Sequence, residues 1–270
     1  MTSQFSSCDE YGFLRSQGFD TKSYEEFMGS YLRILSRRGL KWEKLVRGAS
    51  SGNNAYAKLS YGAKLKRFVR KGIPGAHRKG VWLQVSGALR LRAEEPDLYP
   101  AMLALETQNK AVLDQIVADM PRTFPDNTHF DSTNPASMQT PLLRVLRALA
   151  NANPKVGYCQ GLNYVGGLLL LATRDEEATF WLLKALTERI LPEYYAPAMP
   201  GLLVDMRVLA VMVRQEAPRV AAHIDRLGLP WALIASKWFI CLYADVLPVE
   251  TVLRIWDCLF AEGSKVGLGE

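Results

Sequence analysis

The strongest constraint on the fold is the spacing of apolar residues, which recur every three or four positions along most of the chain. The segment "SMQTPLLRVLRALANANP" places four of them on one side of a helix: Leu142, Val145, Leu146 and Leu149. This helix should end before Pro154, because the residue before a proline avoids α geometry. We find no alternating apolar and polar segment long enough to be a convincing strand. The pattern therefore predicts an all-α, multi-helix fold around one continuous core.

The N-terminal part predicts two helices and a boundary. "SYEEFMGSYLRILSRRG" predicts a helix capped by Ser23, with Glu26 completing a capping box, and ended by Gly39. "SSGNN" (residues 50–54) predicts a loop, and a second basic helix is expected over residues 57–70. We therefore divide the chain into an N-terminal helical arm, residues 1–65, partly basic, and a main domain, residues 66–270.

The remaining helices are expected between proline-rich turns. One should cover residues 77–86, another should follow Pro96, and a third should lead to Met120. Six further apolar segments between Tyr158 and Phe260 have helical spacing. No fixed-period repeat is visible, so a helical solenoid is not predicted.

Basic residues are concentrated in one part of the sequence. Residues 33–92 hold 16 Lys and Arg but a single acid, Glu43, whereas the rest holds 17 basic and 26 acidic residues. Such a stretch can meet an anionic membrane surface, nucleic acid or an acidic protein face. A helical face that is simply solvated explains it equally well.

Several classes of protein are not indicated. The longest apolar run, Val165–Ala172, falls far short of the ~20 residues of a membrane-spanning helix. The N-terminus lacks the pattern of a secretory signal, so we expect an intracellular protein whose four cysteines are thiols. The three histidines are not spaced for zinc, and no glycine-rich phosphate-binding loop is present. We therefore expect no metal site and no nucleotide cradle.

One arginine stands between two prolines in "IVADMPRTFPDN". An apolar stripe leads to it and should face the core: Val112, Leu113, Ile116, Val117 and Met120. Asp119 lies off that stripe, and Pro121 should end the helix at about Asp119 or Met120. Arg122 then sits in a surface turn that Pro125 stiffens, where a partner can reach it. Considered alone, the spacing favours a simpler interpretation, an ion pair with Asp119 or Asp126.

A second polar residue stands before an apolar helix in "GYCQGLNY". Gln160 is predicted in the loop or first turn before that helix, where its amide offers one acceptor and two donors. A capping role is the alternative interpretation. Cys159 does not suggest a nucleophile, because no histidine forms a recognisable local signature with it.

Three stretches together resemble the TBC domain of Rab GTPase-activating proteins. "GIPGAHRKGVW" is similar to the family's opening motif, with Arg78 and Trp82 as its R-x-x-x-W core. The other two match I-x-x-D-x-x-R-T-x-P and Y-x-Q-G, through residues Ile116, Asp119, Arg122, Thr123, Pro125, Tyr158, Gln160 and Gly161. "KWFICLYADVLPVETVLRIWD" resembles a later helical motif. The resemblance covers roughly residues 66–266, and the order and spacing of the motifs make it specific.

The resemblance implies a TBC-type fold and a role in vesicle trafficking. Arg122 would be an arginine finger and Gln160 a glutamine finger, both entering the active site of a GTP-bound Rab. Asp119 and Arg78 would support the arginine turn, in which Thr123 is also a motif residue. Tyr158 and Asn163 would shape the glutamine loop, and Trp82 would belong to the core.

The resemblance also implies that this protein activates an enzyme and is not itself one. GTP and Mg²⁺ would come with the Rab, so no cofactor is expected, and nucleic acid is not an expected partner. A cytoplasmic protein, peripheral on intracellular membranes, fits this role.

The sequence departs from the family pattern at two places. Position 164, often acidic in the family, is Tyr164. The chain ends in "VGLGE" where the pattern continues, so we expect the last helices to be missing and apolar surface between Trp231 and Phe260 to be partly uncovered. The alternative function is then a non-catalytic helical module that binds a Rab or a membrane.

Overall fold

The computed structural model describes residues 7–49, 56, 59, 61–106 and 109–263. These residues form thirteen α-helices, two short helical turns and two isolated β-bridges, which confirms the all-α prediction. The helices are α1 (Thr21–Ala49), α2 (Ala63–Lys71), α3 (Gly75–Val85), α4 (Ala88–Glu94), α5 (Leu98–Ala104), α6 (Lys110–Asp119), α7 (Gln139–Ala152), α8 (Leu162–Thr173), α9 (Glu176–Ala185), α10 (Pro200–Glu216), α11 (Pro218–Arg226), α12 (Trp231–Ile240) and α13 (Val249–Glu262). A 3₁₀ turn covers Met120–Arg122, and a π turn covers Leu186–Ile190.

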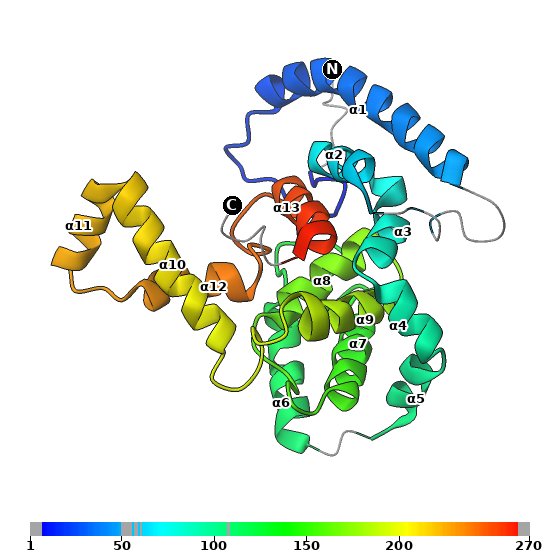
Figure 1. The fold of residues 1–270 in the computed structure, drawn as a ribbon, viewed down its shortest axis with the longest axis vertical. Helices are drawn as coiled ribbons and strands as arrows, with labels where there is room; N and C mark the ends of the chain where they lie inside the picture. Colours follow the sequence, from blue (N-terminus) through cyan, green and yellow to red (C-terminus); the bar gives the residue numbers. More distant parts are fainter. Residues whose placement is uncertain (1–6, 50–55, 57–58, 60, 107–108, 264–270) are drawn as a thin grey trace.

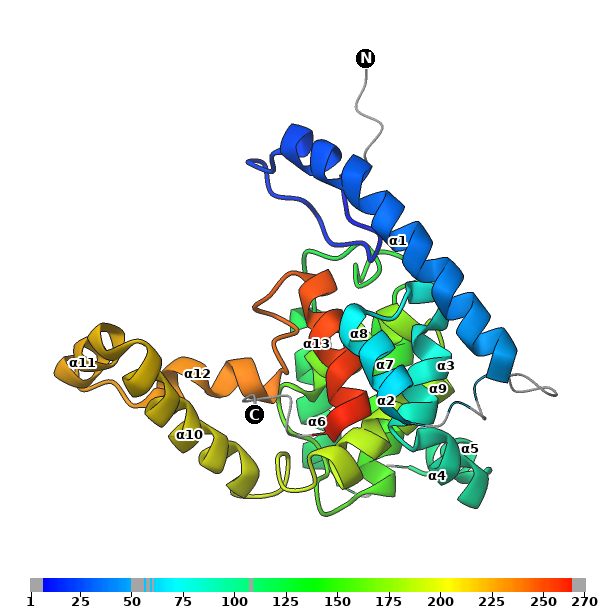
Figure 2. The same ribbon diagram turned by 45° about the horizontal axis from the view of Figure 1, so that its top comes forward.

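The helices α7, α8 and α9 form the centre of the bundle, with α3–α6 and α13 around them (Figures 1 and 2). Helix α8 is apolar on nearly all sides and is buried over almost its whole length, as expected of a central helix. In α7 the predicted stripe of Leu142, Val145, Leu146 and Leu149 is buried. The apolar period alone therefore identified the inward side of α7 correctly.

Helix α1 is longer than predicted at both ends. Asp20, not Ser23, caps it, because the Asp20 carboxylate accepts hydrogen bonds from the Ser23 amide (3.0 Å) and the Ser23 hydroxyl (2.6 Å). Gly39 lies inside the helix, which continues to Ala49 because Trp42 is fully buried and donates to the Gly72 carbonyl at 2.9 Å. Tertiary packing beyond the glycine outweighed its helix-ending tendency.

The region between the first two helices differs from the prediction in a second way. Helix α2 begins at Ala63, after Gly62, and not at residue 57, and it ends at Lys71. The predicted loop at residues 50–54 lies outside the described residues. The division into an arm and a main domain stays a prediction, although α1 packs against α2 through the Trp42–Phe68 ring contact.

A buried carboxylate joins α13 to the start of the bundle. Asp257 of α13 is fully buried and accepts from the Ile73 amide and the Trp82 indole, both at 2.9 Å. The Arg78 guanidinium lies 3.4 Å away, and Arg78 is itself buried. Burial raises the pKa of Asp257 to about 6, and the charge of Arg78 opposes that shift, so the carboxyl is ionised at neutral pH. One side chain thus links the α2–α3 turn, α3 and α13.

The helices α10 and α11 project away from the bundle (Figures 1 and 2). They pack against each other, and α10 also packs against α12. The predicted single core is present, and α10 contributes Leu202 and Met206 to it. Between Trp231 and Phe260, Leu233 is 72% exposed, whereas Trp256 and Phe260 are buried. The expectation that missing helices leave this surface uncovered stays a prediction.

We predict that Asp257→Ala lowers the free energy of unfolding by about 3–5 kcal/mol, because it removes the buried carboxylate beside the Arg78 guanidinium and the acceptor of the Ile73 amide and the Trp82 indole. Urea denaturation followed by circular dichroism measures the change. The control is Glu94→Ala, which removes an exposed i,i+4 pair with Arg90 and should cost less than about 1 kcal/mol. Equal losses in the two variants would contradict the role given to Asp257.

Candidate functional site

Arg122 lies at the end of a tight turn directly after α6. The α-helix ends at Asp119, as the proline predicted, and the chain continues as the 3₁₀ turn with Pro121 near its start. The Arg122 side chain is 70% exposed. A rigid turn therefore presents a charged side chain to the surroundings.

Asp119 is buried, which the sequence pattern did not predict. Its carboxylate accepts a hydrogen bond of 2.7 Å from the Tyr158 hydroxyl, which lies on the other side of the site. Burial is the main cause that raises the pKa of Tyr158, so this hydroxyl stays protonated and donates. Val117, predicted to face the core, is exposed instead. The buried side of α6 therefore differs from the predicted apolar stripe: it includes Asp119 and excludes Val117.

The predicted local ion pair of Arg122 is weak in this structure. The Arg122 guanidinium lies 4.0 Å from the Asp119 carboxylate, at the outer limit of an ion pair. A contact of this length, with the guanidinium largely in solvent, contributes little stability. Arg122 therefore stays accessible, and the orienting role expected of Asp119 stays a prediction.

A second hydrogen-bond path joins the turn that carries Arg122, called the arginine turn, to the turn that carries Gln160, called the glutamine turn. Asn163 is buried, and its amide nitrogen donates to the Thr123 hydroxyl at 2.8 Å while its amide oxygen accepts from the Gly161 amide at 3.0 Å. The Thr123 hydroxyl in turn donates to the Asp119 carbonyl at 2.8 Å. The predicted supporting residues Thr123, Asn163, Tyr158 and Asp119 thus form one connected group.

Gln160 lies in the exposed turn immediately before α8, where the sequence predicted it. Gly161 follows with φ of +113°, and a Cβ there would stand 2.3 Å from the Ile240 side chain. Only glycine fits this position without a shift of α12. The glycine therefore fixes how the Gln160 turn enters the helix.

Tyr164 is a contact that sequence reasoning missed, since it appeared only as a departure from the family pattern. Its hydroxyl donates to the Arg122 carbonyl at 3.1 Å. Tyr164 lies in the first turn of α8, whereas Gln160 precedes the helix, so no helical period relates the two residues. The contact joins residues 42 positions apart in the sequence, and no local pattern indicates it.

Arg122 and Gln160 line the same cavity of about 610 Å³. Its walls come from α6, from the turn before α8, from the segment around Tyr195 and from Ile240 at the end of α12. Cys159 also lines it, but burial raises the pKa of this thiol to about 11, so it stays protonated and is not an activated nucleophile. The cavity therefore presents a guanidinium and an amide to whatever enters it.

The resemblance implied that Arg78 supports the arginine turn, but its side chain makes its contacts elsewhere, and the supporting role stays a prediction. Arg78 is in α3 and contacts Asp257, Glu250 and the Tyr11 hydroxyl, and none of its described contacts reaches Asp119 or Arg122. The physical reason is the packing of α3 against α13, which encloses the guanidinium beside the Asp257 carboxylate. Trp82 belongs to the core, as predicted.

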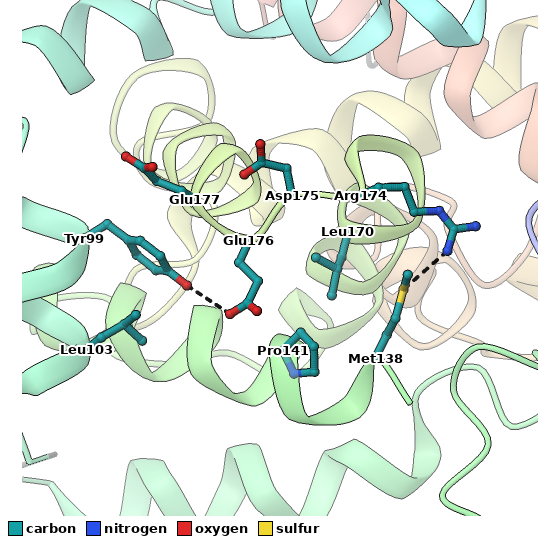
Figure 3. Close-up of a pocket in the computed structure, with 9 residues that line it drawn as sticks. All are labelled: Tyr99, Leu103, Met138, Pro141, Leu170, Arg174, Asp175, Glu176 and Glu177. Atoms are coloured by element: carbon teal, nitrogen blue, oxygen red, sulfur yellow. Dashed lines mark hydrogen bonds between the residues drawn. The ribbon is translucent and has the colours of Figure 1, made fainter. Parts of the chain in front are cut away.

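A second cavity, of about 490 Å³, lies between α5, α7 and the start of α9 (Figure 3). Its acidic residues have partners: Tyr99 and Arg144 hold Glu176, Arg92 pairs with Glu177, and Lys79 pairs with Asp175. Since these charges are compensated within the protein, we assign no chemistry to this cavity.

The described residues hold no further candidate site of the kinds that follow. They contain no group of His, Cys, Asp and Glu that could hold a metal ion. Among the residues that the structure describes, no disulfide joins Cys8, Cys159, Cys241 and Cys258. No described helix combines the length and the apolar character required to cross a membrane.

Comparison with known proteins identifies the family. The model of the Rab-GTPase-TBC domain matches residues 75–268. The human growth hormone-regulated TBC protein 1 is 48% identical over 258 residues, covering 96% of this chain and 74% of that protein. The Xenopus laevis protein of the same name is 47% identical, and the Caenorhabditis elegans growth hormone-regulated TBC protein 6 is 38% identical. These two alignments also cover 96% of this chain, and 73% of each relative.

Solved structures agree with the family match. The crystal structure of the Chlamydomonas flagellar RabGAP TBC domain superimposes with a TM-score of 0.78 at 32% identity, covering 96% of this chain and 83% of that one. The Ypt/Rab-GAP domain of Gyp1p gives a TM-score of 0.69 at 23% identity, over 86% and 81% of the two chains, and so supports the fold alone. The chain belongs to the family of Rab-GTPase-TBC domains.

Proposed function

We propose that this protein accelerates GTP hydrolysis by a Rab-family GTPase, with Arg122 as an arginine finger and Gln160 as a glutamine finger. The observation that carries this proposal is that both side chains line one open cavity, on turns that are hydrogen-bonded to each other. Family membership supports the Rab as partner. The GTP-bound form is the state on which the two side chains can act.

The chemistry of each side chain suits this role. Phosphoryl transfer spreads negative charge over the phosphate oxygens, and a guanidinium supplied by a second protein is worth ~10³–10⁵ in rate. The planar fork of Arg122 can span two oxygens, which a lysine ammonium cannot do. The Gln160 amide can accept a hydrogen bond from the attacking water and donate one to a phosphate oxygen, which fixes the direction of attack.

The protein in this proposal is an activator that contributes side chains and no cofactor. GTP and Mg²⁺ are carried by the Rab, where the metal neutralises the phosphate charge. The exposed position of Arg122 is compatible with delivery into a partner's site. Its rigid turn lowers the conformational entropy lost on docking.

We predict that Arg122→Ala lowers the stimulated hydrolysis rate by at least about 10³-fold, and Gln160→Ala by about 10²-fold or more. Arg122→Lys should also be strongly impaired, because the charge remains but the fork is lost. Single-turnover GTP hydrolysis by a panel of Rabs measures the effect.

The matched control for these variants is Arg90→Ala, which removes an exposed arginine on α4, far along the chain from the two turns. Its rate should equal that of the wild type. If Arg122→Ala and Gln160→Ala retain wild-type rates on every Rab that the protein stimulates, the assignment of the two fingers is wrong.

We predict that Tyr158→Phe lowers the maximal stimulated rate by about tenfold and changes KM for the Rab little, because a hydrogen bond to a charged group contributes ~1.5–3 kcal/mol. Without this hydroxyl, Asp119 no longer joins the arginine turn to the glutamine turn. The control is Tyr194→Phe, which removes a similar 2.8 Å bond to Asp205 outside the cavity lining. Equal effects of the two variants would refute a specific role for Tyr158.

A second function, docking on an anionic membrane surface, is favoured by the outer face of α1. Arg33, Arg37, Lys41 and Lys44 recur along one side of this helix and are exposed, opposite the buried Trp42. Within the described part of the chain, no carboxylate forms an ion pair with these four side chains. Ile34 and Leu40, 51% and 60% exposed, flank them. A basic face with flanking apolar residues is typical of helices that lie on a membrane.

We predict that replacing the four basic residues of α1 by glutamate abolishes binding to phosphatidylcholine vesicles that contain phosphatidylserine, since each contributes ~1 kcal/mol near such a surface. Vesicle co-sedimentation at low and high salt measures this. The control changes four exposed arginines of α10 and α11 to glutamate: Arg207, Arg214, Arg219 and Arg226. Equal loss in both variants would mean that net charge, and not this face, governs binding.

A further inference from the structure

A short segment before α1 folds back onto the arginine turn. We call residues 7–15 the N-terminal strap; it precedes the region matched by the family model. The Asp9 carboxylate accepts from the Tyr11 and Phe13 amides, both at 2.9 Å, and the Arg15 amide donates to the Ser7 carbonyl at 2.9 Å. The strap therefore holds its own shape through local hydrogen bonds.

The strap is bonded to the backbone that follows Arg122. The Leu14 amide donates to the Asp126 carbonyl and the Thr128 amide donates to the Gly12 carbonyl, each at 2.9 Å. The buried Asn127 side chain donates to the Tyr11 carbonyl at 3.0 Å. These three bonds fix residues 126–128, the exit of the arginine turn.

The approach of the two segments is close enough to require a glycine. Gly12 has φ of +90°, and a Cβ at this position would lie 2.6 Å from the His129 ring and 2.8 Å from the Thr128 hydroxyl. The backbone of the strap at Gly12 thus lies directly against the side chains of residues 127–129.

Aromatic rings continue the contact towards Arg122. Phe13 packs edge-on against Phe124, with ring centroids 5.0 Å apart, and Phe124 also contacts Tyr164 at 5.4 Å. Phe124 has φ of +50°, a left-handed conformation that costs a bulky residue of order 1–3 kcal/mol and persists only where its surroundings hold it. Phe13 and Tyr164 supply part of that support, together with Phe130, whose ring lies 5.6 Å from that of Phe124. The Tyr164 hydroxyl also donates to the Arg122 carbonyl.

The other side of the strap is anchored in the core. The Tyr11 hydroxyl accepts from the Arg78 guanidinium at 2.9 Å, and Arg78 is held by the buried Asp257. A continuous set of contacts therefore runs from α13 through α3 and the strap to the arginine turn.

We propose that Phe13 and Tyr11 of the N-terminal strap are positioning residues for Arg122, which hold the strained Phe124 turn in the conformation that presents the guanidinium. This inference rests on the proposed function, in which Arg122 acts on the γ-phosphate of a partner. The strap acts through the turn and does not enter the cavity, whose lining contains no strap residue.

The variant that tests this is Phe13→Ala, with Phe13→Leu as the conservative partner that restores an apolar contact to Phe124. Phe13→Ala should lower the stimulated kcat between about tenfold and about a hundredfold, since a displacement of ~1 Å can cost ~10²-fold. KM for the GTP-loaded Rab should change less than twofold, and Phe13→Leu should recover most of the rate. The control is Phe27→Ala, which removes an exposed α1 ring that stacks only on Tyr31 among the described rings.

The same substitution made in the Arg122→Ala background separates positioning from a general loss of folding. If Phe13 acts through Arg122, Phe13→Ala lowers the rate in the wild-type background and not in the Arg122→Ala background. An equal reduction in both backgrounds would mean that the substitution lowers the folded fraction, and would overturn the proposal.

Backbone hydrogen exchange gives a second readout that needs no Rab. The Thr123 and Asn127 amides donate within the turn, to Met120 and Phe124, at 3.1 and 3.0 Å. Phe13→Ala should speed their exchange at least about tenfold while the amides of α7 keep wild-type protection. Unchanged exchange at both amides would overturn the proposal. If Arg122→Ala has no effect on rate, the finger assignment fails instead, and the exchange result still decides whether the strap holds the turn.

Discussion

The buried carboxylate of Asp257 is the interaction on which the other contacts depend. A charge that is fully buried must have partners, and Asp257 obtains them from the α2–α3 turn and from α3: the Ile73 amide, the Trp82 indole and the Arg78 guanidinium. These partners lie about 180 residues earlier in the sequence. The need to compensate one charge therefore closes the bundle, bringing α13 against α2 and α3.

The same constraint extends to the candidate site. Arg78, enclosed beside Asp257, donates to the Tyr11 hydroxyl and so anchors the strap. The strap in turn contacts Asn127 through the Tyr11 carbonyl and Phe124 through the Phe13 ring. The arginine turn and the glutamine turn are joined more directly, through Tyr158 with Asp119 and through Asn163 with Thr123. A turn that is bonded on both sides is pre-organised, so less entropy is lost when a partner docks.

Much of this could be predicted because it depends on local rules. Apolar spacing predicted the buried stripe of α7, and Pro121 predicted the end of α6. Boundaries governed by distant contacts were missed. Gly39 does not end α1, since the buried Trp42 continues the helix by packing on α2, and no local pattern reports that contact.

In the candidate site, too, the features set by local rules were predicted and those set by distant contacts were missed. Its two finger candidates were found by motif, whereas the burial of Asp119, the Tyr164 contact and the location of Arg78 were not, because each depends on a partner at least about 40 residues away. The sequence by itself determined that the chain is all-helical, and which residues form the two turns, because propensity, proline geometry and apolar period act over a few residues. Only the tertiary structure decided that these turns share a cavity and that the strap supports one of them, because burial and hydrogen bonding are satisfied between segments far apart in the chain.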